Sequence, residues 1–182
     1  AQAAEGFALY GEPKYKPGFT HFDYVNPDAP KGGGIKLAYT ANFDSMNPYI
    51  LKGISAPELS TYVYQTLMTP SYDEPQSFYA LVANSIVIAD GGRKIRFTLD
   101  SRARWEDGTP ITADDVVFSF HALKEKGHPS YRVLYKPMTI AKTGPLAVEF
   151  TVTGPVEREQ PLLVAALPVL PEKYFCPLDV PP

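Results

Sequence analysis

The sequence predicts an α/β to α+β lobe in which helices pack on a sheet whose strands are largely antiparallel. Three features predict this class: two pairs of apolar-alternating runs, a Gly-containing turn inside each pair, and one amphipathic helix between the pairs. The 182 residues are 45% hydrophobic and 20% charged, which is typical of a globular protein. A chain of this length can bury one good core or two small lobes.

The first part of the chain is rich in Gly, Pro and aromatic residues and has little periodicity. We therefore expect residues 5–34 to form an extended segment that lies across a surface. Apolar and polar residues then alternate at 35–40, which predicts a strand. The run Lys31-Gly32-Gly33-Gly34 precedes this strand, whereas a phosphate loop follows a strand and opens a helix. A flexible entry into the strand is the better interpretation.

A helix is predicted from Pro57 to about Met68. Ser55 and Glu58 have the spacing of a capping box, and Pro57 falls in the first turn, where its missing N–H costs nothing. Three apolar residues recur at four-residue spacing and would form the buried face of this helix: Leu59, Val63 and Leu67.

Two hairpins are predicted further along the chain. Residues 85–89 and 93–99 alternate and are separated by Asp90-Gly91-Gly92, a strong hairpin signal. Residues 139–142 and 147–153 form a similar pair. A last helix is predicted within 156–167, although Pro161 requires it to begin near that proline.

Between the hairpins, the block from Arg104 to Phe120 combines a tight turn with a helix start. Asp-Gly followed by Thr-Pro suits a turn, and Thr112 with Asp115 has the spacing of a capping box. The following helix carries one apolar face: Val116, Val117, Phe120 and Leu123. Trp105 could stack on a substrate, but its place before the turn favours a structural anchor. Capping and turn chemistry likewise explain the carboxylates of this block better than an acid/base pair does.

This block resembles the signature of the extracellular solute-binding proteins of family 5, the dipeptide- and oligopeptide-binding proteins of ABC importers. Its Trp, its Asp-Gly-Thr-Pro turn and its Thr-Ala helix start carry the resemblance. Upstream, the run from His21 to Gly33 is similar to the YejA-type subgroup, which is associated with oligopeptide and microcin C uptake. The similarity extends from about Phe7 to about Phe175, and the chain resembles an amino-terminal portion of the family.

The resemblance implies a periplasmic-binding-protein-like lobe (class II, cluster C type) that is incomplete relative to the family. In the family, two large lobes enclose the peptide, and a smaller lobe is attached to the first. The implied division is an extended segment at 1–34, the first strand and helix of a large lobe at 35–68, a small lobe at 69–170, and a return segment with an atypical tail at 171–182.

The resemblance also assigns ligand contacts. In the family, the loop between the first strand and first helix supplies part of one wall of the peptide site, which falls here on Lys52, Gly53 and Ile54. A second contact, an aromatic residue after a Ser-Pro-like turn, falls on Tyr131, although the order in His128-Pro129-Ser130 differs from that pattern. The alternative is that all four are loop residues with no ligand.

The sequence shows no catalytic or metal-binding pattern. It has no Gly-x-Ser-x-Gly elbow, and its three histidines do not have metal-ligand spacing. We therefore expect no enzyme activity, no cofactor and no metal. The net charge of −3 gives no basic field for nucleic acid or anionic lipid, and no apolar run reaches the ~20 residues of a membrane span.

The function expected from the resemblance is that of a periplasmic, monomeric component that delivers oligopeptides, peptide–nucleotide antibiotics included, to a membrane permease. The opening Ala1-Gln2-Ala3 resembles the end of a cleaved signal peptide. One alternative is a sugar or metal-chelate ligand on the same scaffold, and another is a truncated structural module without transport function. Cys176 is the one cysteine, so no internal disulfide is expected.

Overall fold

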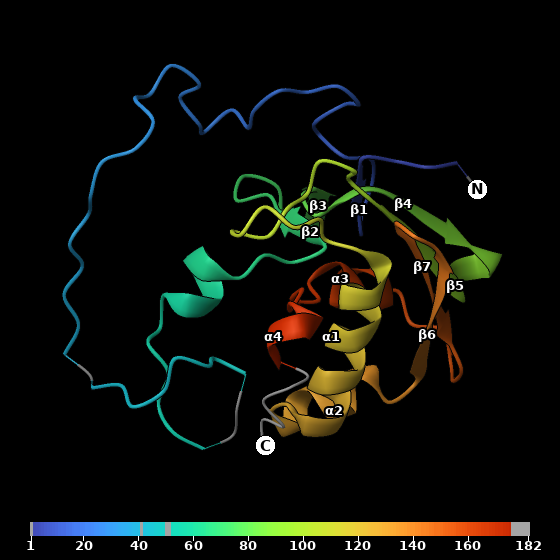
Figure 1. Ribbon diagram of the computed structural model, residues 1–182. Helices are drawn as coiled ribbons and strands as arrows, with labels where there is room; N and C mark the ends of the chain where they lie inside the picture. Colours follow the sequence, from blue (N-terminus) through green and yellow to red (C-terminus); the bar gives the residue numbers. More distant parts are fainter. Residues whose placement is uncertain (1, 41, 50–51, 176–182) are drawn as a thin grey trace.

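The computed structural model describes residues 2–40, 42–49 and 52–175. These residues contain two antiparallel sheets, packed beside α-helices, and a long open segment that runs outside them (Figure 1). The mixture of sheets and helices confirms the fold class expected from the sequence. The predicted tail at 176–182, with Cys176, lies outside the described residues.

The larger sheet has four strands in the order β4-β5-β7-β6. They are β4 (Ala83–Ala89), β5 (Lys94–Leu99), β7 (Ala147–Val152) and β6 (Met138–Gly144). Both predicted hairpins are confirmed, since β4 pairs with β5 and β6 with β7, all antiparallel. At the first turn, Gly91 and Gly92 have φ values of 61° and 95°, which glycine adopts without steric cost.

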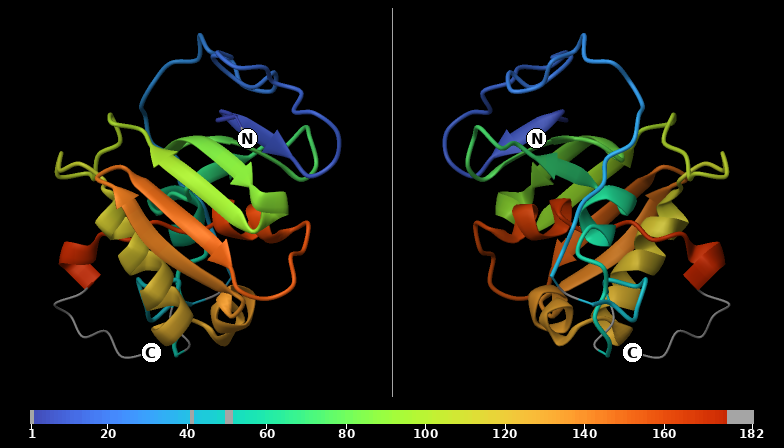
Figure 2. Two further views of the ribbon diagram at one scale, coloured as in Figure 1. Left: turned by 90° about the vertical axis from the view of Figure 1, so that its right-hand side faces the viewer. Right: turned by 90° about the vertical axis from the view of Figure 1, so that its left-hand side faces the viewer.

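Helix α1 (Ala113–Lys126) covers one face of this sheet, as Figure 2 shows. Its side chains Val116, Phe120 and Leu123 are buried, and the Phe120 ring lies edge-on to Phe150 of β7 at 5.7 Å. The predicted capping box is present, with the N–H of Thr112 donating to Asp115 Oδ2 at 2.9 Å. The helix therefore begins where the sequence predicted.

The smaller sheet has the order β1-β3-β2, with β1 (Gly6–Ala8), β3 (Ser77–Ala80) and β2 (Met68–Pro70). These short strands were not predicted, because three or four residues are too few to show an alternating pattern. Through β1 the amino-terminal segment is paired with β3, and three of its rings surround the buried Tyr79: Tyr15, Phe19 and Phe22. The segment therefore lies across a surface, as expected, and is fixed there by aromatic packing.

A cluster of ion pairs and hydrogen bonds joins the same amino-terminal segment to Asp73. Lys14 Nζ lies 2.6 Å from Asp73 Oδ2 and 2.7 Å from Asp23 Oδ2, and Tyr15 Oη donates to Asp73. Hydrogen bonding to Lys14 holds the pKa of the Asp73 carboxyl below its usual range. Burial raises the pKa of Tyr79 to about 12, aided by its hydrogen bond to Glu74.

The remaining α-helices are short: α2 (Pro129–Tyr135), α3 (Gln160–Ala165) and α4 (Glu172–Phe175). Helix α3 corresponds to the helix predicted within 156–167. It begins at Gln160 and has Pro161 in its first turn, where the proline needs no N–H donor. Helix α2 was not predicted, because its seven residues are too few to show a helical period.

Two predictions for the segment before residue 65 are wrong. Residues 35–40 form no strand. A strand requires a neighbouring strand to pair its N–H and C=O groups, and no described residue pairs with 35–40 in this way. Where a helix from Pro57 to about Met68 was predicted, the structure has only a five-residue π-helix, η1 (Leu59–Val63). The expected side-chain cap is not formed. Val63 is exposed, whereas Leu67 is buried beside β2, so the four-residue spacing did not mark one helical face.

Two main-chain hydrogen bonds join the end of this open segment to the chain after α3. The N–H of Leu67 donates to the carbonyl of Leu167 at 3.1 Å, and the N–H of Val169 donates to the carbonyl of Gln65 at 2.9 Å. The antiparallel bridge between Thr66 and Pro168 places the chain that follows η1 beside the chain that leads to α4.

Candidate functional site

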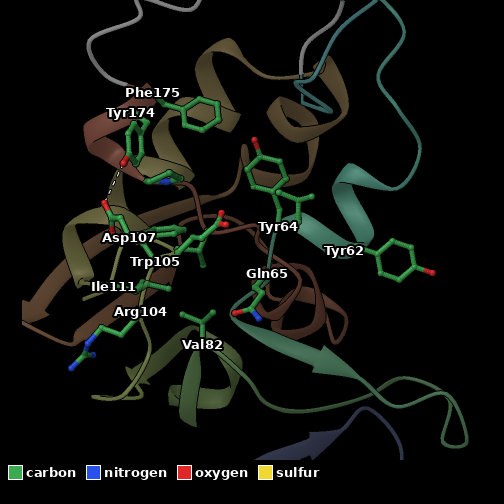
Figure 3. A pocket seen from close by; sticks show the side chains of 14 residues that line it. Tyr62, Tyr64, Gln65, Val82, Arg104, Trp105, Asp107, Ile111, Tyr174 and Phe175 are labelled. Carbon is green, nitrogen blue, oxygen red and sulfur yellow. Dashed lines mark hydrogen bonds between the residues drawn. The ribbon is translucent and has the colours of Figure 1, made fainter. Parts of the chain in front are cut away.

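A groove of about 640 Å³ lies between η1, the turn after β5 and α4 (Figure 3). Aromatic side chains from all three elements line it, namely Tyr62 and Tyr64, Trp105, and Tyr174 and Phe175. Arg104, Glu106 and Asp107 add charge at the turn, and Gln65 adds an amide. The groove combines flat apolar area with a polar rim, which is the usual make-up of a binding surface.

A row of aromatic rings leads from this groove to α2. The Tyr64 ring lies 6.4 Å from Phe175 and 5.1 Å from Tyr49. Tyr49 in turn lies 6.4 Å from Tyr131. The predicted ligand residue Tyr131 is therefore connected to the groove by ring contacts through the buried Tyr49, although it does not line the groove itself.

Tyr131 is held firmly in α2. Its ring stacks on that of the buried Tyr135 at 5.9 Å, and burial raises the pKa of the Tyr131 hydroxyl above its ordinary value. The helix start is fixed by His128, whose Nδ1 accepts a hydrogen bond from the N–H of Ser130 at 3.3 Å. A tyrosine presented in this way offers a rigid ring face with a polar tip.

The other predicted ligand residues, Lys52, Gly53 and Ile54, are exposed in a tight loop. The main chain of Ile54 is already engaged: its N–H donates to Asp44 Oδ1 at 2.6 Å, and its carbonyl accepts from the N–H of Asp44 at 2.9 Å. Gly53 has a φ of 94° and lies against the same carboxylate. Ile54 therefore offers its side chain, and not its main chain, to a ligand.

The loop lines a second hollow of about 340 Å³, together with Leu37, Tyr39 and Phe43. Tyr131 is not among the residues that line it. The structure thus does not bring the two predicted ligand sites into one hollow.

The block around Trp105 contacts α4 through the side chain of Asp107. Asp107 accepts hydrogen bonds from Lys173 Nζ, from Tyr174 Oη at 3.1 Å and from the N–H of Thr109 at 2.9 Å. The bond from Lys173, followed by those from Thr109, holds the pKa of the Asp107 carboxyl well below its usual range. The turn is therefore tied to α4 by an ionised carboxylate.

The start of α1 holds the same returning chain. Asp115 Oδ1 accepts from the N–H of Glu172 at 3.1 Å, while its other oxygen caps α1. The buried Ser119 Oγ accepts from the N–H of Leu170 at 2.7 Å. Asp115 and Ser119 thus accept from main-chain donors, whereas Asp107 and Asp114 accept chiefly from the lysine side chains of Lys173 and Lys142. These contacts fit the structural interpretation of the block.

Sequence reasoning missed Tyr49, Tyr64 and Phe175, which join the groove to Tyr131. The sequence is 13% aromatic, but this composition does not show which rings meet. Their contacts depend on the crossing of Gln65 and Val169, which is a tertiary feature.

Within the described ranges, no group of three or more His, Cys, Asp or Glu side chains is arranged to hold a metal ion. A search of the same residues finds no helix with the length and apolar character of a membrane span.

The fold and the sequence comparisons define the chain as part of a bacterial extracellular solute-binding protein. Residues 77–177, more than half of the chain, match the model of the bacterial extracellular solute-binding proteins, family 5 (its middle region), and the chain belongs to this family. Its similarity to the YejA proteins confirms the resemblance noted in the sequence.

Two curated relatives and one solved structure illustrate the similarity. YejA of Escherichia coli K12 is 44% identical over 169 residues, which cover 93% of this chain and 28% of YejA. The peptidoglycan-binding protein YepA of Agrobacterium fabrum is 39% identical over 186 residues, covering 97% of this chain and 30% of YepA. The periplasmic oligopeptide-binding protein of a Thermotoga maritima ABC transporter superimposes with a TM-score of 0.53 at 25% identity, over 63% of this chain and 21% of that protein.

The chain therefore spans less than a third of the length of the curated relatives that it matches. The matching family model describes solute-binding proteins, so the comparisons offer no reaction to assign to the groove.

Proposed function

We propose that this chain is part of a periplasmic binding protein that captures oligopeptides and delivers them to a membrane permease. The observation that carries the proposal is membership of family 5, together with 44% identity to YejA over nearly the whole chain. The protein would be exported with its signal peptide removed and would act as a monomer. Ligand closure, without any catalytic step, would present a surface to the permease.

Within this protein, residues 35–68 would contribute to a large lobe and residues 69–170 would form the small lobe. Lys52, Gly53 and the exposed side chain of Ile54 would form one part of the peptide-binding wall. Tyr131 would form another, because its ring is held between Tyr49 and Tyr135 and needs no reordering on binding.

Peptide is favoured over other solutes by the aromatic surface around Tyr131, which offers apolar area with polar edges. The name of the Agrobacterium relative supports a second ligand class, peptide-bearing fragments of peptidoglycan. A sugar or a metal chelate remains the third class, because one scaffold can host different ligands.

The test uses a hybrid in which these 182 residues replace the matched part of Escherichia coli YejA. Calorimetric titrations with an oligopeptide pool, peptidoglycan fragments, an oligosaccharide and a nickel chelate separate the ligand classes. We expect binding of the peptide pool or of the peptidoglycan fragments. Binding of the sugar or the chelate alone would overturn the peptide assignment.

Two matched variants test the site. Tyr131→Ala should weaken peptide binding about tenfold or more, because a stacked ring contributes about 1 kcal/mol or more beyond its area. Tyr10→Ala, which removes an exposed tyrosine near the amino terminus, should leave the affinity unchanged. Equal affinities for the two variants would remove Tyr131 from the site.

A further inference from the structure

Two exposed tyrosines from distant parts of the chain meet at the surface. Tyr24 lies in the amino-terminal segment, and Tyr72 lies in the turn between β2 and β3. Their ring centroids are 5.8 Å apart, with planes inclined at 61°, and the N–H of Tyr72 donates to Tyr24 Oη at 3.4 Å. Tyr24 is 44% exposed and Tyr72 is 83% exposed. The two rings form an open corner, which we call the Tyr24–Tyr72 platform.

The Tyr24 ring is fixed by packing on its inner face. It stacks on Phe22 with ring centroids 5.2 Å apart and planes 6° apart. Phe22 in turn lies edge-on to the buried Tyr79 at 5.5 Å. A ring that is already held in place loses little freedom when a partner binds, which lowers the entropic cost of binding. Tyrosines of this kind are frequent among the central residues of protein interfaces.

Carboxylates are in excess around the platform. Asp23 precedes Tyr24, Asp73 follows Tyr72, and the two carboxylates share one cation, Lys14 Nζ, at 2.7 and 2.6 Å. Residues 5–31 and 71–76 contain six carboxylates and three lysines, so their net charge equals the −3 of the whole chain. The excess negative charge of the chain therefore lies in these two segments, and such a field attracts partners of the opposite charge.

The molecule already places cations on tyrosine rings of the amino-terminal segment. Lys14 Nζ lies 4.9 Å from the centroid of the Tyr15 ring, and the Arg158 guanidinium lies 4.3 Å from that of Tyr10. A cation over an aromatic face is attracted by the charge distribution of the ring, and nearby carboxylates add to this attraction. The exposed rings of the platform offer the same chemistry to a lysine or arginine from outside the chain.

The platform is suited to a protein partner rather than to a small cation. Small ligands bind in concave sites that bury most of their surface. Neither Tyr24 nor Tyr72 lines the Trp105 groove or the second hollow. An open surface with aromatic rings at its centre is usual for protein interfaces, in which tyrosine and arginine are enriched.

We propose that the Tyr24–Tyr72 platform docks a second protein through a basic surface, with a lysine or arginine side chain of that partner placed between the two rings. Asp23 and Asp73 attract the cations of the partner, and the fixed Tyr24 ring supplies apolar contact. Both tyrosines lie outside residues 77–177, so the family match assigns them no role. The inference goes beyond the proposed function, because it concerns neither the peptide ligand nor the predicted ligand residues.

The first experiment uses a folded basic protein as the probe, because such a protein is too large to enter a peptide-binding cleft. Native cytochrome c, which is rich in lysine, is titrated calorimetrically against the YejA hybrid at low ionic strength. Fully acetylated cytochrome c is the control without lysine charge. We expect the native probe to bind about tenfold more tightly or better, since charge complementarity carries the contact. Equal affinities of the two probes would overturn the proposal.

Variants locate the binding on the platform. Tyr72→Ala should weaken binding of native cytochrome c about fivefold or more, the equivalent of one cation–π contact. Tyr62→Ala, at a position 74% exposed in η1, should leave the affinity unchanged. An effect of Tyr62→Ala equal to that of Tyr72→Ala would remove the platform from the contact.

A second pair of variants separates local charge from net charge. Asp23→Asn should weaken binding about threefold or more. Asp114→Asn is the matched control, because Asp114 also pairs with a lysine at 2.7 Å and its side chain is 55% exposed against 67% for Asp23. Equal losses in the two variants would show that binding follows net charge alone and would contradict the proposal.

Carbodiimide cross-linking gives an independent map of the contact. The reagent joins a carboxylate to a lysine amine as an amide and takes up the released water to become a urea. Mass spectrometry should find cytochrome c joined to peptides that contain Asp23, Asp73 or Glu74, in larger yield than to the peptide that contains Asp114. Cross-links confined to carboxylates outside the platform would reject it as the docking surface.

Two other occupants are tested by hydroxyl-radical oxidation of Tyr72. Addition of chitohexaose should leave this oxidation unchanged in the hybrid. Protection by the sugar, without binding of cytochrome c, would make the platform a carbohydrate surface instead. Tyr72 should also be oxidised equally in the hybrid and in the 182-residue chain. Oxidation several-fold lower in the hybrid would show that the rest of the binding protein covers the platform, which would also overturn the proposal.

The docking surface and the ligand assignment fail independently. Weaker cytochrome c binding by Tyr72→Ala in a hybrid that binds no peptide would retain the platform and reject the ligand assignment alone. Normal peptide binding with no cytochrome c binding would do the reverse. Should the hybrid not fold, the same titrations use the 182-residue chain, in which slow hydrogen exchange of the β5 amides reports folding, and the same outcomes decide.

Discussion

The larger sheet and residues 35–40 both alternate apolar residues with others, but only the sheet buries apolar side chains. Strands β5 and β7 bury alternate side chains in the core to which α1 contributes, whereas the alternating residues Ile35, Leu37 and Tyr39 remain exposed. The difference lies in partners: each strand of the larger sheet pairs with another described strand, and 35–40 pairs with none. Apolar alternation indicates a capacity to pair, and burial follows only where the partner is present.

The largest test of this difference is a matched pair of phenylalanine truncations. Phe97→Ala removes a fully buried ring that lies 5.7 Å from Phe150, and it should cost about 3–5 kcal/mol of unfolding free energy. Phe43→Ala removes a ring that is 58% exposed and should cost less than about 0.5 kcal/mol. Urea denaturation followed by circular dichroism measures both.

Because domains are stable by only about 5–15 kcal/mol, Phe97→Ala should shift the denaturation midpoint far more than Phe43→Ala. The conservative Phe97→Leu, with a smaller loss, keeps the comparison measurable if the alanine variant does not fold. A comparable loss at Phe43 would show that the open segment has a core of its own.

A second pair compares hydroxyl groups in the two regions. Ser119→Ala leaves the buried N–H of Leu170 without its acceptor at 2.7 Å, which should cost about 1–3 kcal/mol. Ser60→Ala in η1 removes only an exposed hydroxyl contact to Pro57, and water can replace it. The same urea titrations should show a shifted midpoint for the first variant alone. No shift for Ser119→Ala would mean that another group satisfies Leu170.

Sequence reasoning succeeded where structure is local. The Thr112–Asp115 capping box, the Asp90-Gly91-Gly92 turn and the two hairpins depend on residues a few positions apart, and all are present. The helix start at Pro161 was likewise fixed by the backbone chemistry of proline.

It failed where structure depends on distant partners. Strand β1 forms because Gly6 meets Tyr79 across the small sheet, a pairing that no local pattern signals. The four-residue spacing of Leu59, Val63 and Leu67 suggested one helical face, but Leu67 is held by Leu167 from across the fold. For the site, Tyr131 was named by resemblance, whereas its link through Tyr49 to the groove required the tertiary structure.

The smallest expected change in stability comes from replacing single carboxylates, Asp107 beside the larger sheet and Glu58 in segment 31–65. Asp107 ties the turn to α4, and its folded-state pKa lies below its ordinary value. A lowered folded-state pKa means that the contribution to stability is present above the unfolded pKa and is lost as pH falls through the folded-state value. Asp107→Asn should therefore lower the thermal midpoint at pH 7, and the gap from the unaltered chain should narrow steadily below about pH 4.

Glu58 is the matched control, because its carboxylate faces Tyr39 within the open segment and raises the pKa of that tyrosine. Glu58→Gln should leave the thermal midpoint unchanged across the same pH range, since the exposed segment contributes little to cooperative unfolding. Differential scanning calorimetry from pH 3 to pH 7 records both variants. A pH-independent gap for Asp107→Asn would show that packing of the turn, and not the charge on Asp107, holds α4, and an equal loss for Glu58→Gln would show that segment 31–65 unfolds together with the sheets.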